Sequence, residues 1–384
     1  MKKVILLFTT VLFSFQLNAQ YSSRVLIPTY GFLTIAPDAR HGGMGDAGVA
    51  TPSDESDFYW NPSKSAFSKK RFSLFSVPYR PWLPKLVSDM YLGYLGASYK
   101  VDDRNAISAS ITYFNLGLFQ VTNNNGIALG NVNSKEWSVS FNYAKKLSSK
   151  LSMGVGFRYI KSSLFEGLNT NTLGFEAKPA QNLAADISLY HHDIDETELF
   201  NFDYGIYLSN IGSKVSYGSV EEGFMPTNLR IGLSPNIKLG AKHKIIGAVD
   251  LNKLLIPTPP EKDNNGKIIR GRDMKNLSAF EGMIGSFTDA PDGFSEELKE
   301  ISLSTGAEYW YDDTYAARIG LLSNSKEKGL SSFFTFGAGV RIVKIVGIDL
   351  AYMINSDSNS ILGNLWRANI NVSFGKIKTQ NEQK

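Results

Sequence analysis

Apolar and polar residues alternate with a period of two along most of the chain after Arg71. Apolar side chains occupy every second position of residues 366–374, and the same pattern runs through residues 151–159 and 137–143. The positions between them hold mostly Gly, Ser, Asn, Asp and Arg. A period of two is typical of β-strands whose two faces meet different surroundings. The pattern predicts an all-β protein whose sheet is apolar on one face only.

Fourteen segments follow this pattern, and most are about ten residues long, the length with which a tilted strand crosses a bilayer. They are predicted to start near Arg71, Met90, Arg104, Lys135, Lys150, Asn182, Thr197, Asn228, His243, Lys299, Thr314, Ser331, Lys344 and Asn364.

Short and long connections alternate strictly between these segments. The short ones are residues 101–103, 147–149, 191–196, 240–242, 312–313 and 343, and the long ones are residues 78–89, 117–134, 165–181, 213–227, 254–298, 324–330 and 355–363. An outer-membrane barrel sorts its connections in this way, into tight periplasmic turns and longer outer loops. Because lipid cannot satisfy unpaired backbone groups, the sheet must close. We therefore expect a fourteen-stranded antiparallel transmembrane β-barrel over residues 71–375, with both termini at the periplasmic end.

Four aromatic residues flank the short turn at residues 312–313, namely Tyr309, Trp310, Tyr311 and Tyr315. Aromatic side chains are enriched where a membrane meets water. We predict that these four belong to the periplasmic aromatic girdle of the barrel.

The first nineteen residues have the three parts of a secretory signal peptide: basic Lys2 and Lys3, an apolar stretch over residues 4–15, and a small-residue cleavage site that ends at Ala19. The apolar stretch is too short to cross about 30 Å of hydrocarbon as a helix. Residues 333–353, the most apolar stretch after it, contain three charged residues. We expect an exported, integral outer-membrane protein with its long loops facing the cell exterior and a periplasmic tail over residues 376–384.

Composition excludes several kinds of chemistry. With 40 Lys and Arg against 36 Asp and Glu, the formal charge of +4 gives no basic footprint for nucleic acid. Cysteine is absent, which excludes disulfides, thiolate metal sites and a cysteine nucleophile. We expect no cofactor.

Residues 20–70 do not alternate and are predicted to form a separate N-terminal segment. Gly42, Gly43, Gly45 and Gly48 lie within seven residues of each other. Such glycines permit turns with positive φ and close backbone packing. The segment is expected to fold into the lumen as a hatch or plug, and a gate or docking element is the alternative.

A run within this segment resembles the N-terminal motif of the PorV/PorQ family of the type IX secretion system. That motif combines A-x-x-x-R-x-x-x-M-G-x-A-x-V-A, an acidic patch and Y-W-N-P. The matching residues are Ala36, Arg40, Met44, Gly45, Ala47, Val49, Ala50, Asp54, Asp57, Tyr59, Trp60, Asn61 and Pro62. The run Ala-Pro-Asp-Ala-Arg makes the resemblance closer to the PorV branch. The family shares a fourteen-stranded barrel, a hatch and the N-P element with the FadL fatty-acid transporters.

The resemblance implies a secretion component without catalysis. Proteins of the PorV type lie in the outer membrane beside the large translocon barrel and bind the C-terminal β-sandwich signal domain of cargo that leaves it. They carry this cargo to a cell-surface attachment complex that contains a sortase-like protease. Outer-membrane lipid is the remaining expected partner.

The sequence gives only weak evidence for a catalytic site or a metal site. His191, His192 and Asp193 lie in a turn, where polar residues usually face water, and the stretch at residues 263–266 lacks the ligand spacing of a calcium loop. No G-x-S-x-G motif occurs, and no histidine lies beside a serine on a predicted strand. We expect neither a metal site nor an enzyme.

Binding is instead expected in two long loops with apolar residues. Residues 254–298 contain several prolines, which stiffen the backbone, and residues 117–134 form the second candidate. Such loops either contact a partner or fold over the barrel mouth as a lid. The candidate contact residues are Leu118, Phe119, Leu255, Ile256, Phe280, Met283, Ile284 and Phe287.

The sequence is also compatible with two other functions. A FadL-like channel for hydrophobic small molecules would use the same scaffold, because a fold alone does not fix a function. A continuous apolar path with a polar head-group site would favour that channel, and the Gly, Ser, Asn and Arg of the inner face argue mildly against it. A purely structural barrel is the third possibility.

Overall fold

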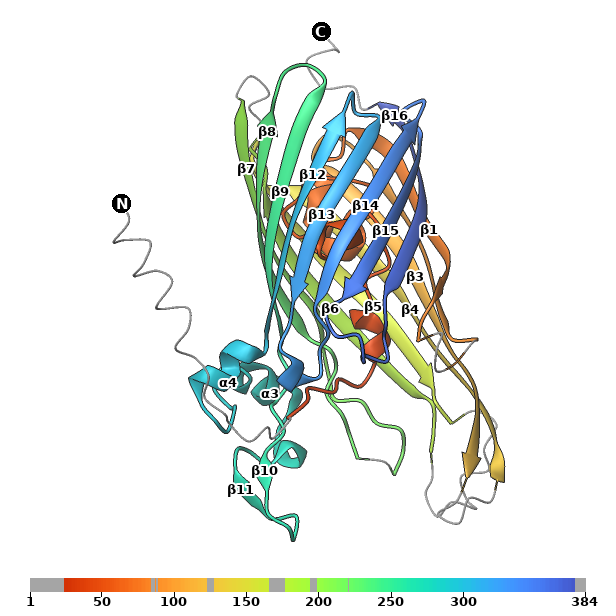
Figure 1. The fold of residues 1–384 in the computed structure, drawn as a ribbon, viewed down its shortest axis with the longest axis vertical. Helices are drawn as coiled ribbons and strands as arrows, with labels where there is room; N and C mark the ends of the chain where they lie inside the picture. The colour runs from red at the N-terminus through yellow and green to blue at the C-terminus, as the bar shows by residue number, and fades with distance from the viewer. Residues whose placement is uncertain are drawn as a thin grey trace.

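A computed structural model of the chain describes residues 24–83, 87, 89–122, 128–165, 177–193, 199–219 and 221–376. Fourteen strands form a closed antiparallel barrel, in which β1 pairs with β16 and completes the ring (Figure 1). The predicted fold class is therefore confirmed. The predicted signal peptide and all but the first residue of the predicted tail lie outside the described residues.

The barrel strands are β1 (Lys70–Pro81), β2 (Tyr91–Lys100), β3 (Asn105–Thr122), β4 (Ala128–Lys146), β5 (Leu151–Ser163), β6 (Ala180–His191), β7 (Phe200–Gly212), β8 (Asn228–Lys238), β9 (His243–Leu254), β12 (Ile301–Tyr311), β13 (Tyr315–Ser323), β14 (Phe333–Ile342), β15 (Val346–Asn355) and β16 (Leu365–Lys376). Thirteen of them begin within a few residues of the predicted starts. The exception is β4, which begins at Ala128 and not near Lys135.

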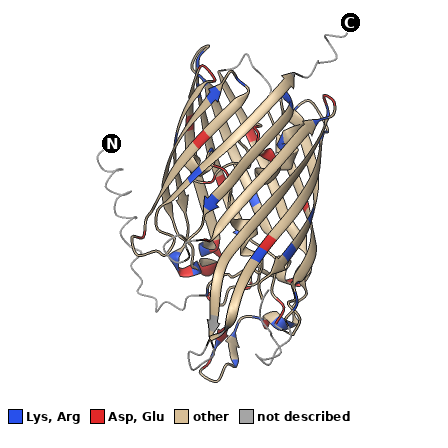
Figure 2. Cartoon of the chain, turned by 90° about the vertical axis from the view of Figure 1, so that its right-hand side faces the viewer, with Lys and Arg blue, Asp and Glu red and all other residues tan. Residues whose placement is uncertain are grey.

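The outer wall carries the apolar half of each alternation. On β14, Phe334 and Phe336 are exposed on the outside, whereas Thr335 between them is buried in the lumen. Charged residues gather around the connections at the two ends of the barrel, and most of the strand length is uncharged (Figure 2). This distribution suits a wall in contact with lipid. Within the described ranges, none of the helices has the length and apolar character needed to cross a membrane.

Short turns lie at one end of the barrel and long loops at the other (Figure 1). In the turn between β12 and β13, Asp312 and Asp313 both have positive φ, 53° and 49°, as a two-residue type I′ hairpin requires. The predicted girdle is wrong for Trp310, which is buried in the lumen between exposed Tyr309 and Tyr311. Three consecutive residues of a strand cannot share one face.

Residues 24–69 pass through the barrel interior before β1 begins (Figure 1). They contain the short helices η1 (Gly31–Thr34), η2 (Gly42–Met44), α2 (Asp57–Trp60) and η3 (Pro62–Phe67). Helix η2 contacts β12 to β15, and η3 contacts β2 to β6 on the other side. The described chain starts with Arg24 among the long loops, whereas β16 ends among the short turns. The expectation that both termini lie at one end is therefore wrong for the N-terminal segment, because this segment runs the length of the lumen.

The connection between β9 and β12 is folded. It contains the small hairpin β10 (Glu261–Lys262) and β11 (Ile268–Arg270), the helical turn η5 (Met274–Asn276), and the helices α3 (Ala279–Gly285) and α4 (Phe294–Lys299). Ser278 and Glu281 form a capping box that starts α3. A further helical turn, η6 (Lys326–Lys328), lies between β13 and β14.

Strands β3 and β4 extend beyond their outer neighbours. Strand β2 pairs with β3 only as far as Asn115, and β5 pairs with β4 only as far as Lys135. From Leu118, which pairs with Asn133, to Thr122, which pairs with Ala128, the two strands continue as a ribbon. We call residues 116–122 and 128–134 the projecting hairpin. The sequence pattern had assigned residues 117–134 to a long connection.

Candidate functional site

The Met44-Gly45 pair of the family-like motif packs backbone against backbone on the barrel wall. Gly45 has a φ of 68°, and a Cβ at this position would lie against the carbonyl group of Leu321. Met44 fits over the inward-facing glycines Gly306 and Gly320, where a Cβ would overlap its backbone. The motif needs glycine at position 45 because both the conformation and the space exclude a side chain.

A chain of alternating buried charges fixes this region to the wall. Arg40 binds Asp54 at 2.5 Å and Glu308 of β12 at 2.7 Å. Glu308 also accepts a 2.6 Å hydrogen bond from Arg318, which lies 2.9 Å from Asp349. Buried charges are tolerated when each has a partner of opposite sign. This pairing joins the N-terminal segment to strands β12, β13 and β15.

Two further barrel residues bind the segment, one through its backbone and one through a side chain. Asp250 of β9 accepts hydrogen bonds from the N–H groups of Gly48 and Val49 at 2.6 and 2.9 Å. Arg367 of β16 pairs with Asp46. The Gly-rich turn of the segment is thus bound by a carboxylate from β9 and by a guanidinium from β16.

The N-P element of the motif is the start of a helix. Asn61 is the N-cap of η3, its side-chain oxygen accepts from the N–H of Ser63 at 3.2 Å, and Pro62 occupies the first turn. Asn and Pro are favoured at these two positions. The Asn61 amide also donates to the carbonyl groups of Val49 and Leu189, at 3.0 and 3.1 Å. This asparagine therefore caps a helix and attaches it to β6.

Of the aromatic pair before it, Trp60 is buried and Tyr59 is partly buried. Trp60 donates from its indole nitrogen to Asp38 at 2.9 Å. Tyr59 packs edge-on against Trp60 and Tyr94. The guanidinium of Arg230 lies 5.4 and 5.2 Å from the centres of the Tyr59 and Trp60 rings. All seven motif residues singled out from the sequence therefore lie in the interior and position the segment.

The structure does bring His41 close to hydroxyl groups, which sequence spacing had not indicated. Its ring nitrogens lie 2.5 Å from Asp38 and 3.0 Å from the hydroxyl of Thr51. That hydroxyl donates to the carbonyl of Gly48, and all of these side chains are fully buried. A nucleophile needs an accessible oxygen and a base free to take its proton. The cluster instead has its bonds satisfied within the segment.

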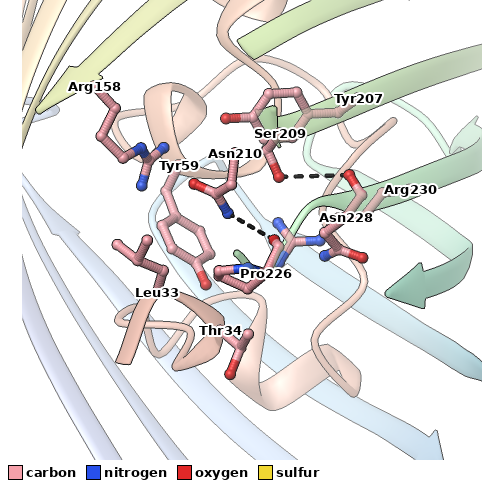
Figure 3. A pocket seen from close by; sticks show the side chains of 10 residues that line it. All are labelled: Leu33, Thr34, Tyr59, Arg158, Tyr207, Ser209, Asn210, Pro226, Asn228 and Arg230. Carbon is pink, nitrogen blue, oxygen red and sulfur yellow. Dashed lines mark hydrogen bonds between the residues drawn. The ribbon is translucent and has the colours of Figure 1, made fainter. Parts of the chain in front are cut away.

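Little space remains between the segment and the wall near Tyr59. A polar cavity there has a volume of about 10 Å³, room for roughly one water molecule. Figure 3 shows its lining residues, in which the Asn210 amide donates to the carbonyl of Pro226 at 3.1 Å. Tyr59, Arg158 and Arg230 point toward this space from different elements. The cavity is too small for a hydrophobic solute.

A larger cavity lies nearer the long loops. Its volume is about 460 Å³, and its lining is mainly apolar. The lining includes Phe32 of η1, Trp82 beyond β1, Phe114 of β3 and Glu136 of β4. Glu136 is buried, and the described part of the chain offers it no ion pair. The cavity combines a mainly apolar lining with one carboxyl group.

The loop candidates divide into buried and exposed residues. Leu255 and Ile256 are buried, so they anchor their loop and do not form a contact surface as the sequence suggested. Phe119 and Met283 are partly exposed. The residues that remain well exposed are Leu118 on the projecting hairpin and Phe280, Ile284 and Phe287 on or next to α3.

A cluster of charges ties the loops to the start of the N-terminal segment. Arg24 binds Glu296 at 2.9 Å and also pairs with Asp292. Lys328 bridges Glu296 and Glu300, at 2.7 and 2.8 Å. Burial pushes the pKa of Glu296 upward, but hydrogen bonds from Arg24 and Lys328 outweigh it and lower the pKa to about 2. We call Arg24, Lys253, Lys328, Glu296, Glu297 and Glu300 the clasp.

The residues weighed as metal ligands have other partners. His192 lies 2.9 Å from the carboxylate of Asp203, and the ring of His191 stacks on Tyr204. Asp263 accepts from the N–H groups of Asn265 and Lys267 in the turn between β10 and β11. Across the ranges that the structure describes, no three His, Asp or Glu side chains are grouped in a way that could hold a metal ion.

The family model for type IX secretion system protein PorV matches residues 18–261, more than half of the chain. The chain belongs to the PorV family. Membership in this family, whose members are secretion components and not enzymes, and the closed barrel identify an outer-membrane component of type IX secretion. The family resemblance inferred from residues 36–62 is confirmed.

Solved structures with a similar fold include two hydrocarbon channels and a toluene transporter. The TodX deltaS2S3 mutant monoaromatic hydrocarbon channel is 12% identical over 88% of this chain and 98% of its own, with a TM-score of 0.52. The CymD monoaromatic hydrocarbon channel is 10% identical over 89% and 99%, with a TM-score of 0.50. The Ralstonia pickettii toluene transporter TbuX is 14% identical over 94% and 100%, with a TM-score of 0.49. At such identities the similarity concerns the fold. No curated protein matches this PorV-family chain.

Sequence reasoning missed the barrel side of the interior site. Asp250, Glu308 and Arg367 bind the N-terminal segment, and Arg318 binds Glu308 beside it. Each is a charged residue at a lumen-facing position of a strand predicted to cross a membrane. A charged residue at a lumen-facing position predicts a partner inside the barrel, because a buried charge needs a group of opposite sign. The sequence alone does not identify that partner.

Proposed function

We propose that this PorV-family barrel binds the C-terminal signal domain of cargo that leaves the type IX translocon and carries it to the cell-surface attachment complex. The long loops would then face the cell exterior, where cargo emerges. The observation that carries the proposal is the filled lumen. Charge pairs to β12 and β16 and hydrogen bonds to β6 hold the lumen segment in place. Function is therefore expected on the loops and not in a pore.

The projecting hairpin is the first candidate surface for cargo. Neither strand of its paired part has a second neighbour among the described residues. Unpaired strand edges present N–H and C=O groups that can bind a strand of another protein. The signal domains expected as cargo are β-sandwiches, which have such strands. Exposed Leu118 would add an apolar contact beside the edge.

Helix α3 is the second candidate surface. Its inner side consists of Gly282, Gly285 and Ser286, which pack closely against the loops. Phe280, Ile284 and Phe287 lie on the other side, spaced by four and three residues, and are exposed. This spacing forms one apolar stripe along a helix. Clustered exposed apolar side chains are typical of protein-binding surfaces.

Shortening the projecting hairpin tests the proposal. A variant that replaces residues 117–133 by a two-residue turn keeps the last pairs with β2 and β5, so the barrel should fold. We expect normal amounts of barrel, loss of co-purifying cargo and retention of secreted proteins in the cell. Shortening the β10–β11 hairpin, residues 261–270, is the matched control and should leave secretion unchanged. Normal secretion after deletion of the whole protein would favour a purely structural barrel.

The second candidate function is a FadL-like channel for hydrophobic small molecules. The cavity of about 460 Å³ supports it, because its lining is apolar and it carries the carboxyl group of Glu136. Such a carboxyl group would favour a neutral or basic solute over a fatty-acid anion. Uptake of a hydrophobic amine by vesicles that contain the purified barrel tests this function. A channel predicts uptake that falls when Phe114 is replaced by Trp to fill the cavity.

A further inference from the structure

Helix α4 lies on the outside of the barrel wall. Along β9, Val249 and Leu251 are exposed on the outer face, and Lys253 continues the same alternation. The strand neighbours of Lys253 are Leu229 of β8 and Ile301 of β12, which also have outward parity. Yet Lys253 is only 7% exposed, because Glu297 of α4 and Glu300 cover it at 3.0 and 2.8 Å. The acidic side of α4 therefore faces the outer surface of the wall. The helix itself lies at the long-loop end of the barrel (Figure 1).

The two sides of α4 are reversed relative to a helix of a water-soluble protein. Glu296 and Glu297 are buried within the clasp, whereas Phe294 and Leu298, four residues apart, are 76% and 51% exposed. Helices on a water-soluble surface normally bury the apolar side. Here the inner side is fixed by salt bridges to Arg24, Lys253 and Lys328. The helix consequently cannot turn over and bury its apolar residues.

The surroundings of α4 indicate what covers this apolar side. Helix α4 leads directly into β12, whose Leu303 is exposed on the outer wall beside Leu251 of β9. Phe294 and Leu298 therefore continue the lipid-facing surface of β9 and β12 past the strand ends. Apolar side chains at this height meet the boundary between head groups and acyl chains.

We propose that α4 is a membrane-interface anchor, with Phe294 and Leu298 inserted among the lipid acyl chains of the leaflet at the long-loop end. The clasp connects this anchor to Arg24 at the start of the lumen segment. Lipid contact thereby holds the loop between β9 and β12 and the start of the segment at the rim of the barrel. This inference goes beyond the proposed function and does not depend on it.

The absence of cysteine allows a direct test. Nitroxide labels at single-cysteine variants Phe294→Cys and Leu298→Cys report depth in phospholipid vesicles that contain only the purified barrel. Collision with oxygen is favoured in lipid, and collision with a water-soluble nickel complex is favoured in water. Phe336→Cys on the wall is the lipid control, and Ile269→Cys on exposed β11 is the aqueous control.

We expect the labels at Phe294 and Leu298 to show the high oxygen and low nickel accessibility of the Phe336 label, at a shallower depth. Lys253→Gln should raise the nickel accessibility at Phe294 several-fold and leave Phe336 unchanged, because it releases α4 from the wall. Nickel accessibility equal to that of Ile269 would overturn the proposal. If these labels then became immobile only in native membranes, a partner protein and not lipid would cover α4.

Discussion

Arg40 of the N-terminal segment binds Glu308 of β12 through two hydrogen bonds, from Nε at 3.0 Å and from Nη2 at 2.7 Å. The two residues are 268 positions apart in the chain. The same carboxylate accepts from Arg318, so one buried group connects the segment to two strands. The lumen segment is therefore fixed by charge pairs that water does not screen, and its removal from the barrel would expose several of them at once.

Replacing Glu308 by Gln should destabilise the protein by about 3–5 kcal/mol, because two buried guanidinium groups lose their partner. Chemical unfolding in detergent measures this change, and faster proteolysis within residues 24–69 should accompany it. Glu327→Gln is the control, since Glu327 pairs with Lys299 at 2.6 Å near the surface. An exposed pair contributes about 0–1 kcal/mol. Equal losses in both variants would contradict a locked segment.

Replacing Gly320 by Ala should cost about 1–3 kcal/mol through overpacking. The new Cβ would overlap the backbone of Met44 and Gly45, which has no room to move. Gly31→Ala is the matched control because a Cβ there meets no atom within 4 Å. Samples are heated to a series of temperatures before electrophoresis. The temperature at which the band of the folded barrel disappears compares the variants. The close fit would be disproved if Gly320→Ala melted with the wild type.

The clasp should resist mild acid. A carboxyl group with a lowered pKa stabilises the folded state above its unfolded pKa, about 4.3 for Glu, and loses this contribution as the pH falls through the folded pKa. With the pKa of Glu296 lowered to about 2, a spin label at exposed Ile27 should stay equally immobile from pH 7 to 4. It should become mobile as the pH falls from 4 to 2.

Glu296→Gln provides the comparison for this titration. The variant should show a mobile label at Ile27 already at pH 7, because Arg24 and Lys328 lose their shared partner. A wild-type label that became mobile between pH 7 and 5 would mean that another group controls the attachment.

The apolar stripe of α3 should be needed for cargo binding. Replacing Phe280, Ile284 and Phe287 together by Ser should weaken cargo affinity by about tenfold or more, since each exposed apolar contact contributes roughly 1 kcal/mol or more when buried. The side chains are exposed, so barrel stability should not change. Ile269→Ser is the control. Unchanged cargo affinity in the triple variant would remove α3 from the binding surface.

Much of the fold was predictable from the sequence because the membrane imposes a strict alternation on each strand. The order of the fourteen strands, the starts of all but β4 and the separation of short turns from long loops follow from that constraint. The projecting hairpin was not predictable, because its strands leave the wall and lose the pattern. Trp310 was misplaced since apolar character alone does not show which side of a strand a residue faces.

The candidate site was predictable only in part. The Gly-rich turn and the Tyr59–Pro62 run indicated where the segment packs, and the structure explains them through a positive φ, a helix cap and a buried indole. Their partners come from strands up to about 330 residues away, such as Asn369, which accepts from Ala39 N–H. Pairings at such separations depend on barrel closure and register, which a single sequence does not specify.

The central claim is that this barrel binds cargo of the type IX secretion system. The most direct measurement is gentle purification of the tagged protein from its native membrane, followed by mass spectrometry of what accompanies it. The account predicts a very large outer-membrane barrel and secreted proteins that retain their C-terminal signal domains. Recovery of hydrophobic small molecules alone, together with normal secretion after deletion of the gene, would contradict it.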